Sequence, residues 1–252
     1  MKNKNLINLF ALTFCFNLNA TPEMLVQVPT KEEAFEITAY YIKSLPWFIN
    51  NGYKDYITLP EHEEFKKIYQ DVEKIPNYNF ENLRNIFYTE IYNPKDYKKG
   101  SQVVQNAVNT IDTKLFEKLK ILNKNWGFDI KPKYFIELTL YGTGGAYWEP
   151  ASKIIIKTGK NGITSYYIPQ SIIRHIIHIG IENNIVKKYN LTQKEKERVV
   201  ALICSIYLKD ILTYIKDPDH LVDYNIDPFI NEKVITENLP KAIEDYITKY
   251  PR

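Results

Sequence analysis

The sequence is poor in cysteine and glycine, with 2 Cys and 9 Gly among 252 residues. Cys15 lies within the first 20 residues, so the rest of the chain holds only Cys204 and forms no internal disulfide. Stability must therefore come from a hydrophobic core, for which a chain of this length with 44% hydrophobic residues is sufficient. Cys204 ends the apolar run 199–204, which indicates a buried structural thiol rather than a nucleophile.

The sequence also has no large excess or cluster of basic residues. The net charge is +3, and Lys2 and Lys4 of the N-terminal segment supply part of it. This nearly balanced charge excludes the basic surface typical of nucleic-acid-binding proteins. The glycine cluster at 142–145 is not followed by Lys and Ser or Thr, which excludes a phosphate-binding loop and favours a tight turn.

Long apolar runs are absent as well, apart from the N-terminal segment. Residues 1–20 are predicted to form a secretory signal, with Lys2 and Lys4 before an apolar stretch at 6–18 and a cleavage point after Ala20. The stretch is too short to span a membrane comfortably. We therefore expect an exported protein, periplasmic or secreted, with no membrane span after signal cleavage. An uncleaved anchor is the alternative.

The remaining pattern predicts an α+β fold that is mostly helical, with a small sheet packed against one central helix. A helical N-terminal region is expected at 21–127, and a core with C-terminal helices at 128–252; both could also form one domain, 21–252. The N-terminal helices are predicted at 31–44, 61–74, 80–88 and 101–123. Strands are predicted at 134–141 and 153–157, with the glycine cluster and residues 146–149 between them, and further helices at 169–188, 192–215 and 240–249.

The central helix carries the most informative residues. Between Ser171 and Glu182 it is almost entirely isoleucine, yet it holds His175 and His178, two of the four histidines of the chain. Residues three or four apart share a helix face, so His175, His178 and Glu182 form one polar row, with Arg174 one turn before His178. Buried ionisable side chains are costly without partners, so this row predicts a metal site, a hydrogen-bonded network or a cleft.

Residues 140–204 resemble a family of bacterial secreted zinc-dependent peptidases of the zincin type. In that family a His-Glu-x-x-His helix continues as Ile-Gly-Ile-Glu, and the next helix carries Lys-Glu-Arg-x-Val-Asp. This chain has Ile179-Gly180-Ile181-Glu182 after His178, and Lys196-Glu197-Arg198-Val199-Val200 in the next predicted helix. The resemblance implies a zincin-like core and zinc as the cofactor.

The zinc motif itself is degenerate in this chain. If His178 matches the second histidine, Arg174 stands at the first ligand and His175 at the general base, while Ala201 replaces the aspartate of the next helix. Arginine has no free lone pair and does not ligate. The resemblance therefore implies a catalytically impaired pseudo-peptidase that binds a peptide or protein, and we predict no catalytic residue.

The predicted groove of this pseudo-peptidase lies along strand 134–141, to which an extended peptide would add as a further strand. Arg174, Tyr141, Gly144 and Gly145 are the residues expected beside the groove.

Two other interpretations of the polar row remain open. The first is an active metal-dependent hydrolase whose ligands are His175, His178 and either Glu182 or Glu197. His175 and Glu182 are about 10 Å apart along a helix axis, so both reach one ion only if the helix bends. The second is a buried network without metal, in which Arg174 pairs with Glu182 or another carboxylate.

Overall fold

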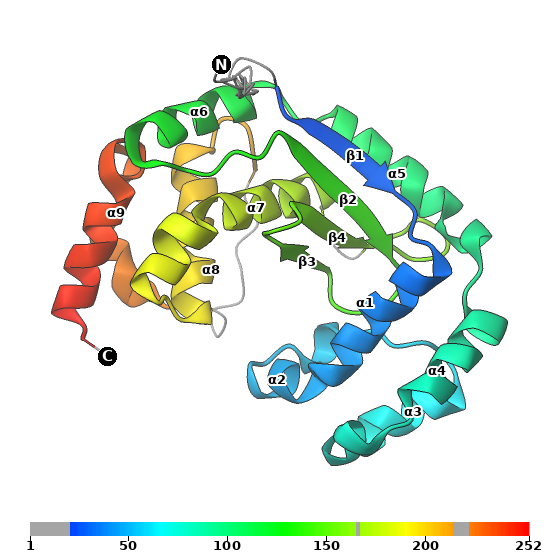
Figure 1. Ribbon diagram of the computed structural model, residues 1–252. Helices are drawn as coiled ribbons and strands as arrows, with labels where there is room; N and C mark the ends of the chain where they lie inside the picture. Colours follow the sequence, from blue (N-terminus) through cyan, green and yellow to red (C-terminus); the bar gives the residue numbers. More distant parts are fainter. Residues whose placement is uncertain (1–20, 165–166, 214–221, 252) are drawn as a thin grey trace, which may run out of the picture.

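The computed structural model describes residues 21–164, 167–213 and 222–251. The predicted signal at 1–20 lies outside the described residues. Four strands form one mixed sheet, and helices surround it (Figure 1), which confirms the predicted α+β class. In the part of the chain that is described, no helix combines the length and the apolar character needed to cross a membrane.

The bounds of the elements agree with the predicted ranges at most positions. The strands are β1 (Glu23–Gln27), β2 (Lys133–Thr139), β3 (Gly145–Trp148) and β4 (Lys153–Lys157), of which β1 and β3 were not predicted. The helices are α1 (Lys31–Lys43), α2 (Leu45–Asn50), α3 (Glu63–Gln70), α4 (Phe80–Ile86), α5 (Lys98–Asn109), α6 (Lys114–Trp126), α7 (Ile168–Ile181), α8 (Gln193–Leu202) and α9 (Glu232–Lys249). Helices α4, α7 and α8 each continue into a π-helical turn, at Phe87–Ile91, Glu182–Lys187 and Ile203–Tyr207.

The sheet has the strand order β1-β2-β4-β3. β1, β2 and β4 are parallel, whereas β3 runs antiparallel to β4. After β2 the chain passes to the edge of the sheet as β3 and then returns between the two as β4. The edge strands are therefore β1 and β3, and our prediction that strand 134–141 forms an edge is wrong, because β2 pairs on both sides.

The N-terminal region differs from the prediction at three places, one of which is helix α2, which was not predicted. Strand β1 begins the described chain and joins the sheet, so residues 21–127 are not purely helical. The helix predicted at 101–123 is two helices, α5 and α6, and between them the Asp112 carboxylate accepts from the Lys114 amide at 2.9 Å. Apolar residues keep a helical spacing across this break, which is why the pattern alone missed it.

Two capping boxes predicted from the sequence are present. Thr30 and Glu33 exchange hydrogen bonds at the start of α1, and Thr192 and Glu195 do so at the start of α8. Glu195 is buried and also accepts from the Tyr246 hydroxyl at 2.8 Å, which ties α8 to α9. The two caps fix where α1 and α8 begin.

Helix α7 packs against β3 and β4 in the centre of the molecule. Its isoleucines account for this position, because five of them are fully buried: Ile172, Ile176, Ile177, Ile179 and Ile181. Helices α1 and α2 lie on the other side of β3 from α7 and α8 (Figure 1). The edge strand β3 thus lies between two groups of helices.

Candidate functional site

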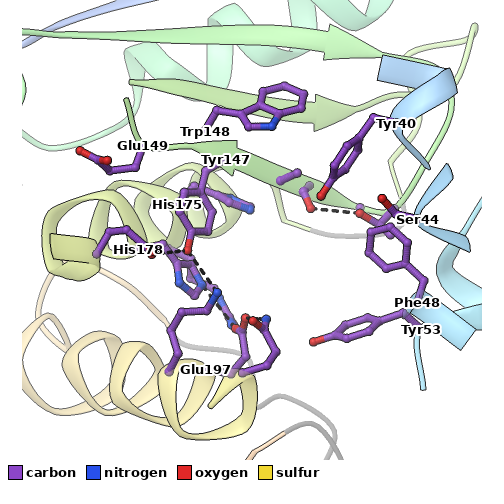
Figure 2. A pocket seen from close by; sticks show the side chains of 18 of the residues that line it. Tyr40, Ser44, Phe48, Tyr53, Tyr147, Trp148, Glu149, His175, His178 and Glu197 are labelled. Atoms are coloured by element: carbon purple, nitrogen blue, oxygen red, sulfur yellow. Dashed lines mark hydrogen bonds and ion pairs between the residues drawn. The ribbon is translucent and has the colours of Figure 1, made fainter. Parts of the chain in front are cut away.

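A groove of about 910 Å³, here called the central groove, runs along β3 between the two groups of helices (Figure 2). One side is formed by α7 and α8, which supply Arg174, His175, His178, Gln193, Lys196 and Glu197. The other side is formed by α1, α2 and the turn after them, which supply Tyr40, Lys43, Ser44, Trp47, Phe48, Tyr53 and Tyr56. β3 and the residues around it, 143–150, complete the wall.

Helix periodicity brings Arg174 and His178 to the same face of α7, and both side chains meet Glu197 of α8. The Arg174 guanidinium donates to Glu197 Oε2 at 2.8 Å, and His178 Nε2 lies 3.3 Å from the same oxygen. Gln193 donates to the other oxygen, Oε1, at 2.7 Å. Arg174 therefore pairs with Glu197, which is the other carboxylate that the predicted buried network allowed besides Glu182.

The electrostatics of this network favour an ionised Glu197. Burial by itself raises the pKa of the carboxyl, but His178 and the Arg174 guanidinium outweigh it and hold the pKa well below its ordinary value. Only 14% of the Glu197 side chain is exposed, so its charge depends on these partners. Removing Arg174 would leave the buried carboxylate with only His178 and Gln193 as partners.

The two histidines carry their protons on different nitrogens. His175 Nδ1 lies 2.6 Å from the Ser171 carbonyl, which can only accept, so a neutral His175 carries its proton on Nδ1. His178 faces the Glu197 carboxylate with Nε2, so its proton lies there, and Nδ1 has no partner among the described residues. The ring of His175 lies against Gly145, where an added Cβ would come within 2.6 Å of Cε1.

Tyr147 of β3 links the sheet to both helices. Its ring stacks on His178 with centroids 5.0 Å apart, and its hydroxyl donates to Glu182 Oε2 at 2.8 Å. The hydroxyl also accepts from Lys196 Nζ at 3.2 Å. Burial raises the pKa of Tyr147, and the bond to Glu182 adds to the shift, so the phenol stays protonated. Glu182 is thus bound to Tyr147 rather than directed at the histidines.

The remaining predicted groove residues divide into two groups. Gly144 and Gly145 line the central groove, as expected. Tyr141 does not: it is buried in the core with its ring 5.9 Å from that of Phe87. No local motif in the sequence marks Tyr147, Lys196 or the aromatic side of the groove, because the fold assembles them from distant segments.

The side chains present do not fit a zinc ion in this arrangement. Within 21–164, 167–213 and 222–251, no three His, Cys, Asp or Glu side chains come together as a metal-binding group. Glu197, the carboxylate nearest His178, is engaged by the cation of Arg174, which repels a metal and cannot ligate it. The candidates His175, His178, Glu182 and Glu197 therefore do not form one ligand set.

The lowered pKa of His175 predicts that the free energy of unfolding depends on pH. Burial, with the neighbouring His178, lowers the pKa of His175 to about 3 from an ordinary 6.5. Between these values the unfolded chain binds a proton that the folded chain does not, so the free energy of unfolding falls as the pH drops below 6.5. Between pH 7.5 and 5 we expect a loss of about 1–2 kcal/mol from this group.

Urea denaturation at both pH values measures this loss. His175→Asn is the matched variant, and its free energy of unfolding should change less between the two pH values than that of the wild type. Glu197 does not contribute in this window, because its lowered pKa acts only below its ordinary value of 4.5. If the free energy of unfolding changed equally between the two pH values in both proteins, the assignment of this loss to His175 would be contradicted.

No family model, curated protein or solved structure matches the chain.

Proposed function

We propose that the protein is an exported, zincin-like pseudo-peptidase that binds an extended peptide, or an extended segment of a protein, in the central groove without hydrolysing it. One observation carries the proposal: the edge strand β3 lines a groove whose base holds an arginine–glutamate pair at the position where the resembled family has its first zinc ligand.

The backbone of β3 supports binding by strand addition. The Gly144 carbonyl accepts from the Lys157 amide of β4 at 3.2 Å. In an antiparallel pair the bonded residues alternate, so Ala146 and Trp148 direct their amides and carbonyls toward β4, and Gly145 and Tyr147 direct theirs toward the open edge. The Gly145 carbonyl is satisfied there by the Thr143 hydroxyl at 3.0 Å. The Tyr147 backbone is the group available to an added strand.

The same geometry argues against hydrolysis. A zincin needs a carboxylate base beside the metal-bound water, and His175 stands at that position with its Nδ1 proton engaged by Ser171. The alternative, an active hydrolase using His175, His178 and a glutamate, requires Glu197 to leave Arg174 or Glu182 to leave Tyr147. Each step would break a charged or buried contact.

A set of N-methylated peptides tests the proposal on residues 21–252. In an added strand only alternate peptide amides donate to the edge, so N-methylation of one alternate set should abolish binding and methylation of the other set should leave it nearly unchanged. The probes are acetylated, amidated pentapeptides drawn from a randomised library, with binding measured by fluorescence polarisation. Elemental analysis of bound metal and mass spectrometry of the peptides accompany the assay.

The outcomes separate the two functions. Alternating sensitivity to N-methylation, intact peptides and no stoichiometric zinc support the pseudo-peptidase. Stoichiometric zinc that is lost in His178→Ala, together with cleaved peptides, would establish the hydrolase instead. A library from which no peptide binds would overturn peptide binding itself.

A further inference from the structure

The carboxylates that line the central groove have partners of their own, whereas two of its lysines have no carboxylate partner among the described residues. Each of its carboxylates is already bound: Glu197 by Arg174, Glu182 by the Tyr147 hydroxyl, and Glu149 by Lys131 at 2.9 Å. The Lys131 hydrogen bond is the main reason why the pKa of Glu149 lies below its ordinary value. The groove therefore offers no unpaired negative charge to a ligand from these three residues.

Two of the lysines that line the groove have no carboxylate partner in the part of the chain that the structure describes. Among the described residues, neither Lys196 nor Lys43 forms an ion pair with a carboxylate; Lys196 bonds the Tyr147 hydroxyl, and Lys43 lies over the Phe80 ring at 4.8 Å. Lys196 is partly buried, so its ammonium is poorly hydrated compared with a surface lysine. A ligand carboxylate would find its counter-charge there.

The position of Lys196 specifies which residue of a bound peptide it meets. Directly opposed residues on neighbouring strands place their side chains on the same face of the sheet. A peptide residue opposite Tyr147 thus shares the Tyr147 face, on which Lys196 Nζ lies 3.2 Å from the tyrosine hydroxyl. This one peptide side chain is directed toward the ammonium.

The neighbouring peptide side chains face an aromatic surface. They share the opposite face with Trp148, whose ring lies 5.8 Å from that of Tyr40. Tyr40 and Trp47 line the groove and are 42% and 45% exposed, which is high for such large apolar side chains. Covering them by apolar or aromatic peptide side chains would remove that surface from water.

We propose that the central groove selects peptides with an aspartate or glutamate at the residue opposite Tyr147, flanked on both sides by apolar or aromatic residues. This specificity rests on the proposed function, since it needs a peptide added to β3. Lys196 is the residue that determines it, through a charge-assisted hydrogen bond to the ligand carboxylate.

Blocked pentapeptides of the form Ala-Phe-X-Phe-Ala, acetylated and amidated, test the selection. With X as Glu, Gln or Lys, fluorescence polarisation on the wild type should give about tenfold tighter binding of Glu than of Gln, with Lys weakest. Lys196→Met should bring the Glu and Gln affinities together. Lys194→Met is the matched control, because Lys194 is exposed on the same helix and does not line the groove; its preference should equal that of the wild type.

Each result decides a different claim. Peptides that bind with equal affinity for Glu and Gln overturn this selection while leaving strand addition in place. A set in which none of the three binds overturns the selection, and the N-methylation library then decides strand addition separately. Should Lys196→Met fail to fold, the wild type still tests the selection, because the Glu preference must shrink as salt is raised from 50 to about 500 mM.

Discussion

Exchanging Arg174 for histidine and His175 for glutamate is expected to create a zinc site in this protein, with affinity about a hundredfold or more above that of the wild type. The expectation rests on where the side chains already lie. Arg174 and His178 are one turn apart on α7, and both reach the same oxygen of Glu197, at 2.8 and 3.3 Å. Two histidines and one glutamate with a bound water are a known arrangement for catalytic zinc.

The expected gain in zinc affinity has two physical causes. Arg174→His supplies a ligand, and it also removes the cation that neutralises Glu197 and repels a metal. A Zn²⁺ ion then takes over the role of compensating the buried carboxylate. The second substitution, His175→Glu, adds the carboxylate that a hydrolytic base requires, although zinc affinity itself depends mainly on the first.

Equilibrium dialysis with elemental analysis measures the change, and the same double variant carrying His178→Ala is the control. That control retains the charge changes but lacks one ligand, so its affinity should return to the wild-type level. Arg174→Gln, which removes the cation without adding a ligand, should raise the affinity much less than the double variant. Unchanged zinc affinity in a folded double variant would show that α7 is wrongly aligned with the resembled motif.

The sequence predicted those parts of the site that depend on residues close together in the chain, namely a helix face and a helix start. The spacing of His175 and His178 placed both on one helix face, and Thr192 with Glu195 placed the start of α8. These features depend on residues within four positions of each other, where helix geometry dictates the outcome.

The contacts between distant segments could not be derived in the same way. Arg174 could pair with Glu182 on its own helix or with Glu197 on the next, and only the packing of α8 on α7 selects Glu197. Likewise, the exposed Trp47 joins the groove from a segment about one hundred residues away from β3. Alternation predicts a strand at 134–141 but not its neighbours in the sheet, so the sequence alone does not tell that this strand is an inner one.

Replacing Gly180 with alanine is expected to destabilise the protein by about 3 kcal/mol, although the same change in an exposed helix stabilises by about 1 kcal/mol. Gly180 lies inside α7, where glycine costs conformational entropy. An added Cβ would lie 1.9 Å from Cζ of Phe128 and 2.2 Å from Cε1, well inside van der Waals contact. The steric cost therefore exceeds the helix-propensity gain.

The ring of Phe128 has little freedom to move away. Phe128 is fully buried, and Trp126 packs edge-on against it with centroids 5.9 Å apart. The next residue is also fixed, because the Asp129 amide donates to the Gly180 carbonyl at 2.9 Å. Moving the ring would shift the segment that leads into β2, and with it the contact between α7 and the sheet on which the central groove depends.

A double-mutant cycle isolates this contact. Gly180→Ala, Phe128→Leu and their combination are compared with the wild type by urea denaturation. Because leucine is smaller than phenylalanine at this position, the cost of Gly180→Ala should be lower in the Phe128→Leu background, with a coupling of about 1–3 kcal/mol. If Gly180→Ala instead raised the free energy of unfolding, the close approach of α7 to Phe128 would be refuted. The glycine that the sequence shares with the resembled family would then need an explanation other than packing.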